Sequence, residues 1–160
     1  MFDTILRGGT VIDGTGRPAF PADIGITGGT ITAVGDLSAA AAGRTMDVAG
    51  RTVTPGFIDI HRHADAAAFR PDYGSLELRQ GLTTIVNGNC GLSAAPFGPD
   101  HAAAIRAYLR PITGDIPDTL PSASLAAYLA ALLDLPLHTG MLVCAGILRA
   151  DTAGYELEHL

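Results

Sequence analysis

TPGFIDIHRHA, residues 54–64, places two histidines one residue apart at the end of a short apolar run. A proline and a glycine precede the run and indicate the start of a strand. Because side chains alternate between the two faces of a strand, Asp59, His61 and His63 share one face. The two imidazoles can then converge on one cation. The sequence therefore predicts a metal site where this strand gives way to a loop, at the carboxyl end where α/β barrels carry their chemistry.

A second metal-ligand candidate follows the next predicted strand, residues 83–86, which leads directly into the turn NGNCG and Cys90. The carboxyl ends of adjacent parallel strands lie about 5 Å apart, so Cys90 is expected beside the histidine pair. A thiolate is a strong ligand for Zn²⁺. Taken alone, a cysteine in a glycine-rich turn is more often a small buried apolar residue. Together with the histidines, Cys90 is predicted to be the third ligand.

Other titratable residues receive different predictions. Asp65, two positions after the histidine pair, either orients an imidazole, faces the substrate, or is a solvated loop carboxylate. Cys144 lies in the apolar segment MLVCAG and is predicted to pack in the core. Three further histidines are not expected to be ligands, because they lie at a helix start, at a strand start and near the last residue: His101, His138 and His159.

Composition excludes several classes of function. The 160-residue chain is 48% hydrophobic, enough for a sizeable core. Its net charge of −6, without a basic cluster, argues against nucleic-acid binding. All ten basic residues are arginine, which excludes a lysine Schiff base or a carboxylated lysine within these residues. No stretch approaches the ~18 to 20 apolar residues of a membrane span. Two cysteines in unrelated contexts favour a reduced, cytoplasmic protein.

The pattern of strands and helices changes near residue 55. In residues 1–54, Gly8–Gly9 and Gly28–Gly29 each separate two short β-branched runs, which predicts two hairpins in a small antiparallel β module. Strand and helix then alternate through residues 55–160, which predicts a parallel sheet. We expect strands over 56–60, 83–86 and 137–143, and helices over 74–80, over 101–109 before Pro111, and after an N-cap at Ser124.

Four segments together resemble the amidohydrolase superfamily and, within it, the N-acyl-D-amino-acid deacylases (D-aminoacylases). They are FDTILRGGTVIDGTG, ADIGITGGTITAVG, VTPGFIDIHRHAD and GLTTIVNGNCGLSAAP, and the resemblance covers essentially the whole chain. Many amidohydrolases share the H-x-H strand. The GNCG-x-S-x-AP stretch is narrower, because other subgroups bridge their metals with a carboxylated lysine.

The resemblance implies an α/β fold in which a metal-dependent (β/α)₈ TIM barrel stands beside a small β-sandwich. Residues 1–54 would form part of the sandwich, and residues 55–160 the first three strand-helix units of an incomplete barrel. It implies Zn²⁺ held by His61, His63 and Cys90. The substrate would be an N-acyl-D-amino acid, a small molecule hydrolysed to a carboxylate and a free D-amino acid.

Two departures from the family pattern limit this expectation. Family members often carry glycine and histidine before the arginine matched to Arg149, which is expected either to orient a metal ligand or to contact the substrate. This chain reads CAGILR there, so that Ala145 takes the place of the histidine. A closed barrel also takes about 250 residues. We therefore expect the chain to be an N-terminal portion, inactive alone, that needs the C-terminal portion of the barrel or a complementary chain. That part would supply the general base, so no catalytic residue is assigned here.

Two other functions remain open. One is a cyclic-amide hydrolase of the dihydroorotase or hydantoinase type, which shares the H-x-H strand but lacks the cysteine of GNCG. The other is a non-catalytic fragment or structural subunit.

Overall fold

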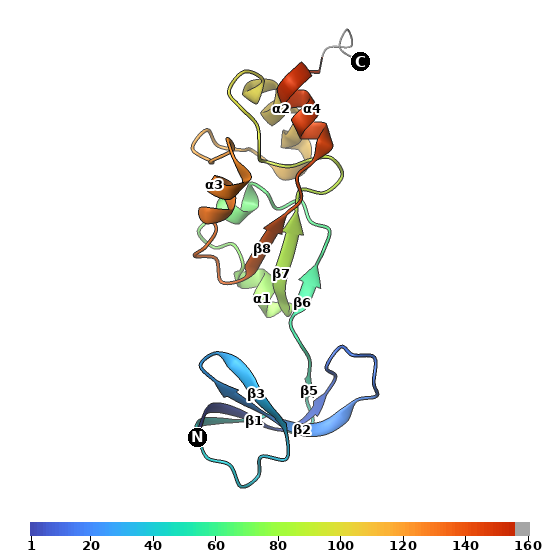
Figure 1. Ribbon diagram of the computed structural model, residues 1–160, viewed down its shortest axis with the longest axis vertical. Helices are drawn as coiled ribbons and strands as arrows, with labels where there is room; N and C mark the ends of the chain where they lie inside the picture. The colour runs from blue at the N-terminus through green and yellow to red at the C-terminus, as the bar shows by residue number, and fades with distance from the viewer. Residues whose placement is uncertain (156–160) are drawn as a thin grey trace. The chain divides into compact units, whose positions relative to one another are not determined.

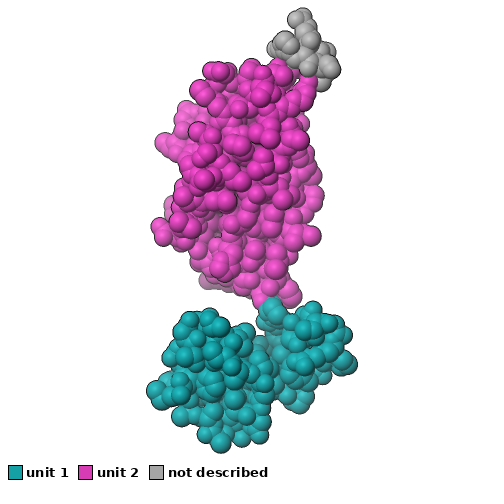
Figure 2. Space-filling view, in the orientation of Figure 1, with its two compact units in different colours: residues 1–55 teal, residues 56–160 magenta. Residues whose placement is uncertain are grey.

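The computed structural model describes residues 1–155 and has a mixed α/β fold (Figure 1). The chain divides into two compact units, Met1–Pro55 and Gly56–Leu160, which Figure 2 shows in different colours. The first unit contains one sheet of five strands. The second contains a sheet of three strands together with all the helices of the described residues.

The sheet of the first unit is mixed. Its order is β3–β2–β1–β4, and β5 pairs with β1 beyond the end of β4. The pairs β1–β2 and β2–β3 are antiparallel, whereas β4 and β5 run parallel to β1. The prediction of a purely antiparallel module was therefore wrong for the last two strands. The bounds are β1 Phe2–Val11, β2 Phe20–Thr27, β3 Thr30–Gly35, β4 Ala42–Asp47 and β5 Thr52–Val53.

The two glycine pairs of this unit have different roles. Gly28 and Gly29, with φ of 58° and 74°, form the predicted hairpin turn between β2 and β3. The hairpin predicted at Gly8–Gly9 was wrong, because β1 continues through both residues. Instead, the pairing with β2 shifts register between Leu6 and Gly9, and Gly8 has a φ of 78°. A positive-φ glycine suits a β-bulge as well as a turn, so the local pattern did not distinguish them.

Three parallel strands form the sheet of the second unit, in the order β6–β7–β8 (Figure 1). The pairing aligns Asp59 with Ile85 and Ile85 with Thr139. The predicted strands and their parallel direction are confirmed, although the third is shorter than the predicted range 137–143. The bounds are β6 Phe57–Asp59, β7 Leu82–Asn87 and β8 His138–Met141.

Helices follow each strand of this sheet. They are the 3₁₀ helix η1 Ala67–Phe69 and the α-helices α1 Ser75–Arg79, α2 Ala102–Thr113, α3 Leu125–Ala130 and α4 Ala145–Ala153. The predicted N-cap is confirmed, since the Ser124 hydroxyl accepts a hydrogen bond from Ala127 N at 3.1 Å. The prediction that α2 ends before Pro111 was wrong. Pro111 lies in the last turn of α2, and Gly114, with a φ of 79°, caps the end of the helix.

The core of the second unit joins its helices to the loop after β6. Tyr128 of α3 is fully buried and donates its hydroxyl hydrogen to the backbone oxygen of Asp65 at 2.8 Å. Around it pack fully buried side chains of α2, α4 and the segment before α2, which are Phe97, Ile105, Leu109 and Ile147. Within residues 1–155, no helix combines the length and apolar character that crossing a membrane requires.

Candidate metal centre

Three potential ligands gather at the carboxyl ends of β6 and β7. β6 ends at Asp59, and His61 and His63 lie in the segment that follows it; β7 ends at Asn87, three residues before Cys90. One ligand atom from each of His61, His63 and Cys90 lies within 4.8 Å of the other two. The His61 Nε2 atom is 3.1 Å from the Cys90 Sγ atom. The two imidazole rings have centroids 5.6 Å apart and planes inclined by 74°.

This donor set fits a zinc ion. Zinc sites in proteins combine imidazole nitrogens with thiolate sulfurs, and catalytic sites use three protein ligands and leave one position open. His61 and Cys90 are exposed and His63 is half-buried, so one side of the group faces solvent. The His63 Nδ1 atom is buried and has no hydrogen-bond partner among residues 1–155. His63 can therefore bind a metal through one ring nitrogen while its other nitrogen donates to a neighbouring acceptor.

The turn that carries Cys90 is held against the segment after β8. Cys90 has a φ of 57°, a left-handed conformation that is uncommon for a residue with a side chain. The Cys144 thiol donates to the Gly88 backbone oxygen at 2.6 Å, and burial raises the pKa of Cys144, which keeps this thiol a donor. Cys144 is buried as predicted. Its hydrogen bond to the Cys90 turn was not predicted, because that contact depends on how β8 leads into α4.

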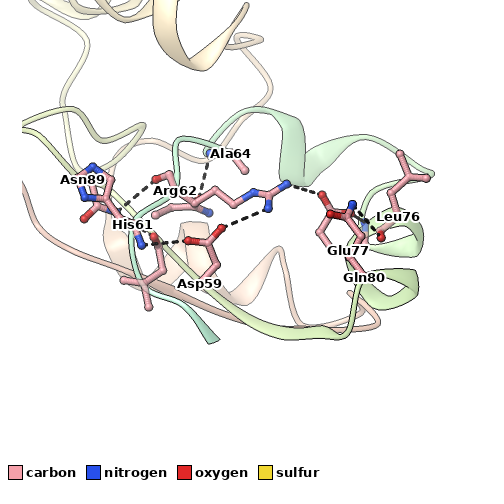
Figure 3. A network of polar contacts seen from close by, with 11 residues as sticks. Asp59, His61, Arg62, Ala64, Leu76, Glu77, Gln80 and Asn89 are labelled. Carbon is pink, nitrogen blue, oxygen red and sulfur yellow. Dashed lines mark hydrogen bonds and ion pairs between the residues drawn. The ribbon is translucent and has the colours of Figure 1, made fainter. Parts of the chain in front are cut away.

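Polar side chains from β6 and from the end of β7 fix the backbone of the histidine segment (Figure 3). The Asp59 carboxylate accepts from His61 N at 3.2 Å. The Asn89 side chain donates to the Arg62 backbone oxygen at 3.3 Å, and the buried Asn87 accepts from Ala64 N at 3.0 Å. The two asparagines were not predicted to have this role, although their positions on either side of Gly88, next to Cys90, were a signal for it.

Asp65 does not belong to the group of three donors that lie within 4.8 Å of one another. Its side chain is fully buried, which excludes the solvated loop carboxylate. One carboxylate oxygen, Oδ1, accepts from Ala94 N at 3.1 Å, while Oδ2 is buried without a hydrogen-bond partner among the described residues. Burial raises the pKa of Asp65 above its usual value. A buried, incompletely bonded carboxylate two residues from His63 is available to an additional donor.

The remaining candidates lie elsewhere in the second unit. Arg149 is exposed on α4, the helix that follows β8. The ring of His101 contacts the Asp151 backbone oxygen at 3.0 Å, at the start of α2. His138 is exposed at the first position of β8. Neither histidine belongs to the metal-ligand group found among residues 1–155. His159 lies outside the described residues.

Comparisons with known proteins agree with one another. The model of the amidohydrolase family matches residues 44–132. A D-aminoacylase of Alcaligenes xylosoxydans xylosoxydans is 50% identical over 96 residues, 60% of this chain and 20% of that protein. An N-acyl-D-glutamate deacylase of the same organism is 46% identical over 131 residues, 81% of this chain and 25% of that protein.

A solved structure shares the fold. It is the N-acyl-D-glutamate deacylase of Bordetella bronchiseptica, in complex with zinc and a phosphonate inhibitor that mimics the tetrahedral intermediate of its reaction. The TM-score is 0.78 and the sequences are 37% identical, over 94% of this chain and 31% of that one. The chain thus spans less than a third of the length of these relatives. With more than half of its residues matched by the family model, the chain belongs to the amidohydrolase family.

Proposed function

We propose that this chain is part of a zinc-dependent amidohydrolase that cleaves N-acyl-D-amino acids to a carboxylate and a free D-amino acid. The observation that carries the proposal is the group formed by His61, His63 and Cys90 at one edge of a parallel sheet. The substrate class comes from the relatives, which are D-aminoacylases and N-acyl-D-glutamate deacylases.

In this proposal His61, His63 and Cys90 bind Zn²⁺. A zinc ion there would act as a Lewis acid, polarising the amide carbonyl and lowering the pKa of a bound water. The chain's own residues orient the ligands. Asp65 is proposed to accept a hydrogen bond from the His63 ring, because both the carboxylate Oδ2 and the ring Nδ1 are buried and have no other hydrogen-bond partner among residues 1–155.

Arg149 is proposed to contact the substrate. It lies on α4, which begins four residues after β8 ends, and its side chain is exposed. The carboxyl end of β8 lies at the same edge of the sheet as the ends of β6 and β7, which carry the zinc ligands. A guanidinium in this place suits the carboxylate of an N-acyl amino acid.

We further propose that residues 55–160 form the first three strand-helix units of a (β/α)₈ barrel, and residues 1–54 part of a β-sandwich. Three parallel strands connected by helices are typical of such a barrel. Apolar side chains at the edge strand β6 and just after it support a missing neighbour, because Phe57, Ile58 and Ile60 are 58%, 61% and 71% exposed. A C-terminal portion or a complementary chain would cover them and supply the general base.

Two other features of the proposal follow from the cysteines. Both Cys90 and Cys144 are free thiols, which favours the cytoplasm as the location. A cyclic-amide hydrolase remains the second candidate for the reaction, and a subunit without turnover the third. A thiolate at position 90 favours the deacylase over the cyclic-amide hydrolase, since the latter group shares only the histidine pair.

Complementation tests the proposal. The chain would be combined with the part of the Alcaligenes D-aminoacylase that it does not match, and assayed with paired N-acetyl-D- and N-acetyl-L-amino acids and with hydantoins. We expect zinc-dependent hydrolysis of the D-substrates that is lost in His61→Ala. Hydrolysis of hydantoins without hydrolysis of the N-acetyl-amino acids would favour the cyclic-amide hydrolase. Stable assembly without any turnover would favour the structural subunit.

A further inference from the structure

Arg62, between the two histidines, is joined to helix α1 by an ion pair. Its Nη2 atom lies 2.6 Å from Glu77 Oε1, and its Nη1 atom lies 3.4 Å from Asp59 Oδ2 (Figure 3). The Glu77 side chain is only 10% exposed and that of Arg62 30%. Burial makes such a pair depend on both partners, because the loss of one leaves the other charge shielded from water without compensation.

Glu77 is itself held in place. Its second carboxylate oxygen accepts a hydrogen bond from Gly74 N at 3.1 Å, which caps the first turn of α1. A carboxylate at this end of a helix is also favoured by the helix dipole. The guanidinium of Arg62 is therefore attached to a fixed point of the fold.

The backbone of Arg62 is fixed on both sides. Its N–H donates to the Val86 oxygen of β7 at 3.1 Å, and its carbonyl accepts from Asn89, the residue before Cys90. The same Asn89 amide also donates to the Val86 oxygen at 2.9 Å. Arg62 is thus connected to α1 through its side chain, and to β7 and the turn of Cys90 through its backbone.

A rival role for Arg62 is anion binding. It lines a pocket of about 340 Å³ together with Arg70, Tyr73 and Glu77. Two carboxylates, those of Asp59 and Glu77, already contact the Arg62 guanidinium and balance its charge. An incoming anion would have to displace them, so the contacts favour a role in holding the loop.

We infer that Arg62 is a positioning residue for the metal site: held by Glu77 and Asp59, it fixes the segment between His61 and His63 and thereby the separation of their rings. The inference rests on the zinc site proposed above and adds the residue that keeps it assembled. Partners that orient metal ligands typically contribute about 10–100-fold to metal affinity. Loss of the Arg62 side chain is expected to weaken zinc binding by this factor.

The test compares zinc affinity with stability in the 160-residue chain. Zinc dissociation constants would be measured by competition with a chromogenic chelator, and urea unfolding would be followed in EDTA. Arg62→Met and Glu77→Gln are expected to raise the dissociation constant about 10–100-fold. Arg62→Lys, which keeps the charge but not the planar fork, is expected to fall between them and the parent. Glu77→Gln removes the charge that pairs with Arg62 but keeps an oxygen that can accept from Gly74 N. Its effect on zinc affinity therefore reports the loss of the ion pair and not the loss of the helix cap.

Arg106→Met is the matched control. Arg106 lies on α2, its side chain is 23% exposed, and it forms a 2.9 Å ion pair with Asp118. It should alter stability but leave zinc affinity within twofold of the parent. An equal loss of affinity in Arg106→Met would overturn the inference, because the effect would then follow from general destabilisation.

The outcomes separate this inference from the proposed function. A parent chain whose zinc affinity is weak and unchanged in His61→Ala would contradict the zinc site itself. A parent that binds zinc tightly, with Arg62→Met and Glu77→Gln within twofold of it, would overturn only the role of Arg62. If Arg62→Met does not fold, Glu77→Gln and Arg62→Lys replace it in the test. Zinc affinities of both variants within twofold of the parent would then overturn the role of Arg62.

Discussion

The Nε2 atom of His61 lies 3.1 Å from the Sγ atom of Cys90, although 29 positions separate the two residues. Two adjacent parallel strands produce this proximity, because β6 and β7 end at the same edge of their sheet. Each strand ends in a short irregular segment that carries its ligand candidates. Polar contacts around Arg62, Asn87 and Asn89, rather than regular sheet pairing alone, hold these segments together.

Replacement of Cys90 should separate metal binding from folding. Cys90→Gly removes the thiol and also relieves the left-handed backbone at φ 57°. Groups that only orient a ligand typically contribute about 10–100-fold to metal affinity. We expect the replacement of Cys90 to lower zinc affinity by more than this. In EDTA, the free energy of unfolding should equal that of the parent or exceed it by about 1 kcal/mol. The left-handed conformation costs a residue other than glycine about this much. Chelator competition and urea unfolding measure the two effects.

Cys90→Ala is the companion variant. It should lose the same zinc affinity without the gain in stability. If both variants bind zinc as tightly as the parent, Cys90 is not a ligand.

Tyr128→Phe should weaken the link between α3 and the loop after β6. The change leaves the buried Asp65 carbonyl without its 2.8 Å hydrogen bond, which is expected to cost about 1–3 kcal/mol. Urea unfolding of the chain in EDTA measures this loss. Tyr108→Phe is the control, because Tyr108 is 54% exposed on α2 and its loss should stay within about 0.5 kcal/mol. Equal stability of the two variants would contradict the structural role of the Tyr128 hydroxyl.

Alkaline pH should destabilise the chain through Tyr73, which is half-buried, and Tyr128, which is fully buried. Burial raises the pKa of Tyr73 to about 12 and also raises the pKa of Tyr128. An unfolded tyrosine loses its proton near pH ~10. Between this pH and about pH 12 the unfolded state binds fewer protons than the folded state, so the free energy of unfolding falls as pH rises.

Below pH ~10 both states keep the proton, and these groups give no pH dependence. Urea unfolding from about pH 9 to about pH 12 in EDTA tests the window, and Tyr73→Phe should show a shallower decline than the parent. Parallel curves for the two proteins would exclude Tyr73 as a cause.

Ile60→Asp should distinguish the isolated chain from an assembled enzyme. Ile60 is 71% exposed just after the edge strand β6, so the isolated chain should change in stability by no more than about 0.5 kcal/mol. If a further strand covers β6 in the assembly, the buried carboxylate should prevent association with the complementing segment. Size-exclusion chromatography of the mixture measures this. Association of Ile60→Asp as tight as that of the parent chain would contradict the covering of β6 by a further strand.

The sequence predicted the features that follow from local periodicity. Alternation along residues 56–60, the N-cap Ser124 and the Gly28–Gly29 turn each correspond to an element of the structure. The proximity of His61, His63 and Cys90 followed from the same strand-end rule. Their binding of a metal stays a prediction.

Contacts between distant segments could not be predicted in this way. The ion pair of Arg62 with Glu77 depends on where α1 packs, and no spacing in the sequence encodes that position. The burial of Asp65 likewise depends on the segment around Ala94. The bulge at Gly8 resembles a hairpin turn in sequence, because both need a positive φ.

Zinc K-edge absorption spectroscopy of the zinc-loaded 160-residue chain tests the proposed centre most directly. Coordination by His61, His63 and Cys90 predicts one sulfur at about 2.3 Å and two imidazole nitrogens at about 2.0–2.1 Å. The sulfur contribution should disappear in Cys90→Gly, and one imidazole in His61→Ala. A shell of oxygen and nitrogen atoms alone, unchanged in Cys90→Gly, would contradict the account.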